Sequence, residues 1–513
     1  MNIPSPTKSK FLSKNINPLI VSSLCVFACL TIFSGLSCLF GTFYDDEISS
    51  IAWAAVSFPN IFDYVKHINS HDIHPPASYL LNKFAFEALG NWKAVQFVNG
   101  TLNAAAIAWF HSCTVDKVAT RERLALTFVL ATAVTSEMWG TGLRWNAYFN
   151  PVFLVLYTVA LSKRPSITVR AAVLGVGTVF LFHTSYLTIV AAPVLWGTFL
   201  AMSLRELRPS CIARVALILF AVVIACLPQL YVMVTVHMSF YATTHSFSVL
   251  YSIVQSISTL ALGTAVFPID YVPDLFLLLL AAASISSLKI IIQDEYVAVL
   301  FGGTLLGLIL LIITRLGIEG RNAVFLYPIA LTLSVLAISR SITWIHRPAI
   351  VSLVLFQIVS VYGFVFHHDT AKGSFNAPFA QTMREISKTK DACQGRTHIF
   401  TRDPVLSYLM QKSNENVSSP YAPSNSTVIS VHQRDCIVII RTYRAALLPD
   451  PLAQFDNQLK HETFRKAQTT NLGYDRFHAI KAWLSNEPFP DYYVTIEVYD
   501  VLHDASVPDW FSL

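Results

Sequence analysis

The chain has 513 residues, of which 54% are hydrophobic and 13% are charged, about half the charged fraction of a typical soluble domain. The formal net charge of +5 is small, and the basic residues lie in short loops between apolar segments, so a basic nucleic-acid-binding patch is excluded. Residues 18–366 are almost continuously apolar, whereas residues 367–513 have the composition of a soluble domain. We therefore expect a transmembrane domain over residues 1–366 and a soluble domain over residues 367–513.

Apolar segments long enough to cross a bilayer follow one another along the first domain. A transmembrane helix needs roughly 20 mainly apolar residues, and helices are the spanning structure that satisfies its own backbone in lipid. The first segment is too long for the apolar core of a signal peptide and has no clear cleavage site, so we expect it to span the membrane. Eleven spans are predicted, at residues 18–40, 94–113, 122–138, 145–161, 170–184, 186–202, 213–236, 273–288, 296–313, 323–339 and 347–366.

The basic residues near the ends of these spans indicate the orientation of the chain. With the N-terminus in the cytoplasm, the loops predicted inside carry fifteen Lys or Arg residues, and those predicted outside carry six up to residue 366. This asymmetry follows the positive-inside rule. It predicts that the soluble domain and two long loops, at residues 41–93 and 237–272, share the outer face.

Residues suited to acid–base and binding chemistry gather in the loop at residues 41–93. Asp45, Asp46 and Glu47 follow the first span directly, and the motif His-Asp-Ile-His-Pro-Pro occupies residues 71–76. Its two prolines suit the first turn of a helix, so we expect residues 77–89 to form a helix in the membrane interface. An acidic triplet alone also fits a solvated helix end. The second motif in the same loop favours a functional site.

The residues in and near this loop could bind either a metal ion or an anion. His71, Asp72 and His74 could contribute ligands to a divalent metal, although such a spacing is too common to assign one. Arg144 and Arg321 stand at the predicted outer ends of the fourth and tenth spans, where a guanidinium group can bind phosphate. An arginine at such a place can equally reach the lipid headgroups. The two arginines could also pair with the nearby acids Glu137 and Glu319, respectively.

These motifs together resemble the first outer loop of GT-C glycosyltransferases, the superfamily of the protein O-mannosyltransferases and the lipid A aminoarabinose transferases. The resemblance is carried by Asp46-Glu47, Asp72-Ile73-His74-Pro75-Pro76 and Tyr79-Leu80-Leu81, and it extends to Leu143–Tyr148 and Arg321–Pro328. It covers roughly residues 40–330 and is nearest to bacterial members that modify lipopolysaccharide or cell-envelope glycans. There are departures. His74 stands where the aminoarabinose transferases have lysine, and Arg144 and Tyr148 are further apart than the usual Arg-x-Tyr.

The resemblance implies an inverting transferase that moves a sugar from a polyprenyl-phosphate donor to a glycan or glycolipid acceptor. An acceptor hydroxyl would attack the anomeric carbon, which requires a carboxylate base and positive groups on the leaving phosphate. The implied base is Asp46, with Asp45 as the alternative, and Glu47 orients a neighbour or binds sugar. The implied phosphate ligands are Arg144, Arg321 and His74. The implied substrate-binding residues are Asp72, Tyr148 and Tyr79. The implied location is a bacterial inner membrane, with the soluble domain in the periplasm.

The soluble domain is predicted to be a small α/β domain. Residues 397–400, 436–440 and 493–498 are rich in β-branched residues and favour strands, and segments near 402–412 and 450–466 favour helices. Cys393 and Cys436 each precede a strand on the predicted oxidising side. They form either a disulfide or two buried thiols.

A multi-span transporter or lipid flippase is the alternative function, and a receptor or scaffold is a second one. Transporters commonly contain two related halves with broken helices and carry charges near the middle of the membrane. No internal repeat is evident in this sequence, and its ionisable residues cluster at one predicted surface. A receptor or scaffold would not need the acidic triplet and the His-Pro-Pro motif in one loop. The transferase therefore remains the leading hypothesis.

Overall fold

The structure is a computed structural model, and it describes part of the chain. It covers residues 18–40, 47, 50–51, 53–54, 59–71, 74–206, 208–237, 253, 256–257, 260–261, 271–314, 320–366, 379–401, 406, 410, 417–418, 428–442, 463–472 and 494–508. The protein is a polytopic α-helical membrane protein with a small C-terminal α/β domain, as predicted from the sequence.

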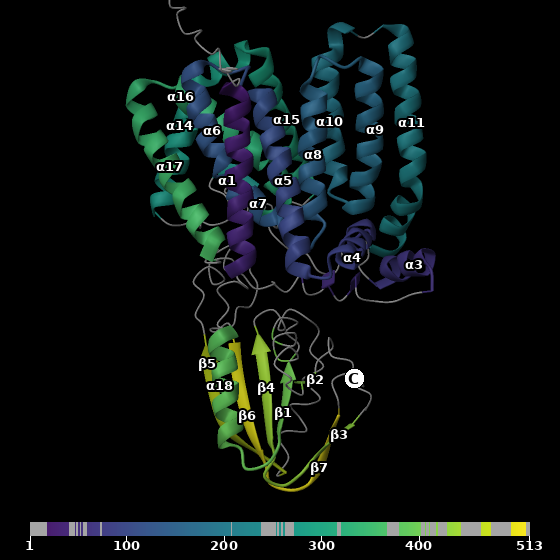
Figure 1. Cartoon of the computed structure of the whole chain (residues 1–513), viewed down its shortest axis with the longest axis vertical. Helices are drawn as coiled ribbons and strands as arrows, with labels where there is room; N and C mark the ends of the chain where they lie inside the picture. The colour runs from purple at the N-terminus through teal and green to yellow at the C-terminus, as the bar shows by residue number, and fades with distance from the viewer. Residues whose placement is uncertain are drawn as a thin grey trace, which may run out of the picture.

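Long helices packed side by side form the membrane domain, and two short ones lie across one end of it (Figure 1). We call this end the α3–α4 end, because α3 (Ile61–His71) and α4 (Ala77–Leu89) lie there. The remaining helices are α1 (Pro18–Phe40), α5 (Trp92–Thr114), α6 (Thr120–Ala131), α7 (Val134–Gly140), α8 (Asn146–Leu161), α9 (Ile167–Thr184), α10 (Thr188–Ser203), α11 (Pro209–Val232), α14 (Tyr271–Gln293), α15 (Glu295–Ile313), α16 (Tyr327–Arg340) and α17 (Thr343–Phe366). Shorter helical turns are η1 (Leu204–Glu206), η2 (Met233–His237) and η4 (Gly320–Leu326).

Each of the eleven predicted spans is helical in the structure, nine of them mainly as a single helix, the third as α6 and α7, and the tenth as η4 and α16. Seven segments of the described residues are long and apolar enough to cross a membrane: α1, α9, α10, α11, α14, α15 and the segment of η4 and α16. The other four predicted spans correspond to α5, α8, α17 and the pair α6 and α7, and α8 is an apolar helix shorter than 18 residues.

Two details of the predicted spans were wrong. The third span, predicted at residues 122–138, is broken into α6 and α7, because the backbone leaves the helical conformation at Thr132 (φ −110°, ψ 15°). The tenth span begins with the 3₁₀ turn η4 and becomes α-helical only at Tyr327.

The helix predicted at residues 77–89 is confirmed in its exact bounds as α4, and its place in the membrane interface stays a prediction. Gly90 ends α4 in the left-handed conformation (φ 65°) and donates its N–H to the carbonyl of Phe86 (2.7 Å). Asn91 then starts α5, because its side chain accepts a hydrogen bond from the Lys93 N–H (2.8 Å). A corner of two residues therefore joins a helix that lies across the bundle end to one that runs along the bundle (Figure 1).

The membrane domain has one apolar core and buried ion pairs at the end opposite α3 and α4. Phe149 and Phe153 of α8 pack edge-on against Phe325 of η4, with ring centroids 5.8 and 4.6 Å apart. Arg340 of α16 binds Glu122 of α6 (3.1 Å), which is 1% exposed, and Asp294 next to α15 (3.3 Å). These pairs hold α6, α15 and α16 together at that end.

A five-stranded mixed sheet of order β2-β1-β4-β6-β5 forms the centre of the C-terminal domain. Its strands are β1 (Thr397–Thr401), β2 (Val417–Ser418), β4 (Cys436–Thr442), β5 (Phe464–Leu472) and β6 (Val494–Val501), and β3 (Val428–Val431) pairs with β7 (Ala505–Pro508) in a second sheet. Val438 and Ile440 share a cluster with Ile386 of the helix α18 (Phe379–Ala392). The alternate residues Ile437 and Ile439 share another cluster with β3 and β7. The central sheet is thus covered on both faces.

The three predicted strands of this domain are confirmed as β1, β4 and β6. The helix predicted at residues 450–466 was wrong at its C-terminal end, because Phe464 begins strand β5, which pairs along its whole length with β6. Most of residues 402–412 lie outside the described residues. Cys393 and Cys436 form a disulfide (Cα–Cα 6.1 Å) that joins the end of α18 to the start of β4. This settles the alternative that the sequence left open.

Candidate functional site

A row of amide side chains on α5 is the structural centre of the candidate site. Gln96, Asn99 and Asn103 are buried, and their spacing of three and four residues places them on one face of the helix. Buried amides are costly in a membrane domain unless they form hydrogen bonds. Each of these three finds a partner in a neighbouring segment, so the row fixes how those segments lie against α5.

Glu47, the last member of the acidic triplet, binds this row. Its side chain is 2% exposed, and its Oε1 accepts hydrogen bonds from Gln96 Nε2 (2.6 Å) and from the backbone N–H of Leu143 (3.2 Å). Leu143 precedes Arg144 in the loop between α7 and α8. Glu47 is therefore held against the loop that carries Arg144, although 96 residues separate Glu47 from Leu143.

Helix α4 holds the same loop from another direction. Asn82 donates its Nδ2 to the carbonyl of Leu143, and its Oδ1 accepts from the Tyr148 hydroxyl (2.8 Å). Asn99 donates to the neighbouring carbonyl of Gly142 (3.0 Å). Non-helical backbone within a membrane domain needs partners for its polar groups. Here Glu47, Asn82 and Asn99 supply them to Gly142 and Leu143.

Glu137 of α7 is, after Glu47, a second buried acidic residue next to this loop. It is fully buried and accepts hydrogen bonds from Asn103 Nδ2 (2.8 Å) and from the hydroxyl of Ser34 on α1. Close packing accompanies these bonds, because a Cβ added at Gly140 would lie 2.5 Å from the Asn103 side chain. The Glu137 carboxylate thus ties α1, α5 and α7 together just before the loop that carries Arg144.

Arg144 itself is 8% exposed, and two other motifs of the sequence lie near it. The ring of His74, from the His-Pro-Pro motif, is 6.4 Å from the ring of Trp145. Phe325 of η4 packs on Phe149, one turn further along α8. Since η4 also contains Arg321, the Arg321–Pro328 segment lies against the start of α8, although the Arg321 side chain is outside the described structure.

The other predicted site residues divide into two groups. Tyr79 is 2% exposed and packs with Tyr64 and Ile68 between α3 and α4. Asp45, Asp46 and Asp72, together with the side chain of His71, lie outside the described residues, so their predicted roles stay predictions. Within the described residues no group of three or more His, Cys, Asp and Glu side chains is placed to hold a metal.

Sequence reasoning missed the residues that organise this site. Gln96, Asn99 and Asn103 recur at helical spacing inside an apolar span, which is a signal for a polar face turned toward other protein. Asn82 had a weaker signal, since one asparagine in an interface helix is unremarkable. None of these four amide side chains can act as an acid or a base, unlike the carboxylates and histidines of the first loop.

Comparisons with known proteins give a distant structural likeness. No protein-family model matches the chain, and no curated protein matches it. Among solved structures, ArnT from Cupriavidus metallidurans in the apo state is similar over 93% of this chain and 96% of that chain, at 11% identity and a TM-score of 0.45. ArnT from the same organism bound to undecaprenyl phosphate is similar over 95% of this chain and 98% of that chain, at 10% identity and a TM-score of 0.37. At these values no residue's role is carried from ArnT to this chain.

Proposed function

We propose that this protein is a membrane-embedded inverting glycosyltransferase of the GT-C type. It transfers a sugar from a polyprenyl-phosphate donor to a cell-envelope acceptor such as lipopolysaccharide, a cell-wall glycan or a glycolipid. The observation that carries the proposal is the pair of hydrogen bonds from Gln96 and Leu143 to Glu47. They hold Glu47, the last residue of the acidic triplet, against the loop that carries Arg144, and this supports a reaction that needs both a carboxylate base and a phosphate ligand.

The proposed chemistry is a single displacement at the anomeric carbon of the sugar. Asp46, or Asp45 in its place, accepts the proton of the acceptor hydroxyl as that oxygen bonds to the carbon. The bond from the carbon to the phosphate oxygen breaks on the opposite side, and polyprenyl phosphate leaves with the electron pair. Arg144 and Arg321 stabilise the charge on the phosphate, with His74 assisting when protonated.

The remaining side chains have positioning or binding roles in this proposal. Glu47 orients the Leu143–Arg144 backbone, since it accepts hydrogen bonds from the Leu143 N–H and from the buried Gln96. Tyr148 is held by Asn82 and faces the same loop. Asp72 and Tyr79 contact the sugar or the acceptor.

We further propose that the α3–α4 end faces outward and that the domains divide at residues 366 and 367. The positive-inside distribution of Lys and Arg supports this orientation. Figure 1 shows the C-terminal sheet beyond that same end of the bundle. In a bacterium this would be the periplasmic face of the inner membrane, where lipid-linked sugars meet envelope acceptors.

The test is sugar transfer by the full chain in nanodiscs. Wild type, Asp46→Asn and Asp45→Asn are each supplied with radiolabelled sugars on undecaprenyl phosphate and with envelope extract, and donor binding is measured separately. Glu87→Gln is the matched control, because Glu87 is exposed on α4. We expect transfer to fall by 10²-fold or more in Asp46→Asn with donor still bound. Equal transfer by wild type and Asp46→Asn would remove Asp46 from the role of base. Lipid or solute movement across vesicles without transfer would favour the transporter.

A further inference from the structure

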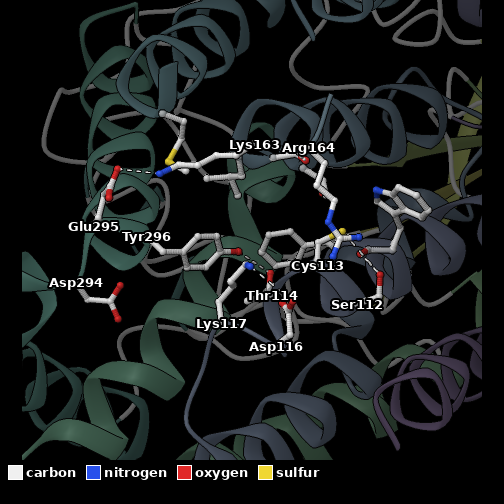
Figure 2. Close-up of a pocket in the computed structure, with 16 residues that line it drawn as sticks. Ser112, Cys113, Thr114, Asp116, Lys117, Lys163, Arg164, Asp294, Glu295 and Tyr296 are labelled. Atoms are coloured by element: carbon white, nitrogen blue, oxygen red, sulfur yellow. Dashed lines mark hydrogen bonds and ion pairs between the residues drawn. The ribbon is translucent and has the colours of Figure 1, made fainter. Parts of the chain in front are cut away.

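A cavity of about 690 Å³ opens at the end of the bundle opposite the α3–α4 end (Figure 2). It lies between the last turns of α5 and α8, near Met202 of α10 and the first residues of α15. Gln96, which binds Glu47, lies 18 residues before Thr114 on α5, so the last residue of α5 is roughly 27 Å along the helix from the contact with Glu47 in the candidate transfer site. The cavity is therefore separate from that site.

The wall of the cavity is apolar and the floor carries hydroxyl groups. Phe110, Leu161 and Met202 line it as buried side chains, and Trp109 lies beside them with 54% of its surface exposed. The Thr114 hydroxyl is 2.9 Å from the hydroxyl of Tyr296. An exposed tryptophan next to charged residues at a helix end is typical of the membrane–water interface.

Charged side chains surround the mouth, and most of them already have partners. Lys163 binds Glu295 (3.2 Å), and Asp294 binds Arg340 (3.3 Å). Lys117 lies 3.6 Å from its neighbour Asp116, in an exposed pair that contributes little.

Arg164 is the exception, since no ion pair joins it to any other residue of the described structure. Figure 2 shows Lys117 extending beside Thr114 and Arg164 extending beside Cys113. Two cations with spare donors thus stand over hydroxyl groups and next to an apolar wall.

We propose that this cavity binds the phosphate of a membrane phospholipid headgroup. Arg164 and Lys117 contact the phosphate, Thr114 and Tyr296 donate or accept hydrogen bonds with the headgroup, and the acyl chains lie along Trp109. The lining carries three basic and three acidic residues, and the ion pairs Lys163–Glu295 and Asp294–Arg340 leave Arg164 and Lys117 as the cations for a phosphate. Cations placed between transmembrane helices at the cytoplasmic side are suited to such headgroups. The site is independent of the proposed transfer reaction, and its variants leave that reaction's residues untouched.

The experiment is native mass spectrometry of the full chain, titrated with phosphatidylglycerol after detergent exchange. Diacylglycerol with the same acyl chains tests the need for phosphate, and inorganic phosphate tests the need for acyl chains. The variants are Arg164→Gln, Lys117→Gln and the double variant. Arg208→Gln and Lys289→Gln serve as controls, because both residues are exposed and lie outside the cavity lining. Unfolding temperatures confirm that each variant is folded, and Arg164→Lys tests whether charge alone suffices.

We expect phosphatidylglycerol to bind wild type and both controls equally. Each single variant should bind roughly fivefold more weakly and the double variant roughly 30-fold, since one basic residue near an anionic headgroup contributes about that factor. Unchanged binding in the double variant, or equal binding of diacylglycerol, would overturn the proposal. So would inorganic phosphate that binds as tightly as phosphatidylglycerol, because the cavity would then be a site for a small anion.

Discussion

Replacing Glu47 by alanine should release the loop that carries Arg144. The substitution removes the acceptor of two buried donors, Gln96 Nε2 and the Leu143 N–H. A buried donor left without an acceptor costs about 1–3 kcal/mol, so the two together cost about 2–6 kcal/mol. If this cost destabilises the loop conformation that binds the donor, about 2 kcal/mol corresponds to a donor affinity that is roughly 30-fold weaker.

Glu47→Gln separates positioning from catalysis, because glutamine keeps an acceptor oxygen at nearly the same place. We expect it to weaken donor binding by less than about fivefold and to retain transfer, whereas Glu47→Ala loses both. The assay is equilibrium binding of polyprenyl-phosphate sugar together with transfer rates in nanodiscs, with Glu87→Ala as the control on an exposed face of α4. If Glu47→Gln abolished transfer as completely as Glu47→Ala while donor binding stayed intact, Glu47 would be the base and the positioning argument would fail.

Three further predictions concern other contacts of the fold. Asn82→Ala and Tyr148→Phe should be non-additive in thermal unfolding, with a coupling of about 0.5–1.5 kcal/mol, because they share one hydrogen bond, and additive effects would contradict that bond. Arg340→Met should destabilise the chain by about 3–5 kcal/mol, since it leaves Glu122 buried without its cation, and restoration by Glu122→Gln in the same chain would support this reason.

The third prediction belongs to the C-terminal domain. Burial alone would raise the pKa of Asp435, but hydrogen bonds from the backbone of His432 and Arg396 and from the His398 ring outweigh it and hold that pKa below the usual value. Because the folded pKa is the lower one, this stabilisation is present above pH about 4 and is lost as the pH falls through the folded pKa. Denaturant midpoints measured from pH 6 to pH 3 should therefore fall less steeply in Asp435→Asn than in wild type.

The helices were more predictable from sequence than the site that they build. A run of apolar residues is a local signal, which is why the bounds of α1 and α4 were predicted to the residue. The break at Thr132 is a change in the backbone at one residue, and such a change leaves no trace in hydropathy. In the C-terminal domain, Phe464 begins a strand because β6 lies beside it, and that partner is distant in the sequence.

The sequence predicted which residue types could act in the candidate site, but not the hydrogen bonds that hold them in place. The acidic triplet and Arg144 were evident as residue types suited to base and phosphate roles. The contact of Glu47 with the loop that carries Arg144 joins residues 96 apart in the sequence, and it is supported by Gln96 of α5, whose amide is neither an acid nor a base. Contacts of this kind are decided by tertiary packing, so a single sequence does not reveal them.

If α4 lies in the membrane interface as predicted, we expect the two-residue corner between α4 and α5 to make the site sensitive to the thickness of the bilayer. A helix lying in the interface follows the lipid surface up or down, whereas α5 is anchored by its own packing through the membrane domain. With only Gly90 and Asn91 between them, a vertical displacement of α4 has no slack to absorb it. Asn82 would then carry that displacement to the carbonyl of Leu143 and so to Arg144. We therefore expect the length of the lipid acyl chains to affect the position of Arg144.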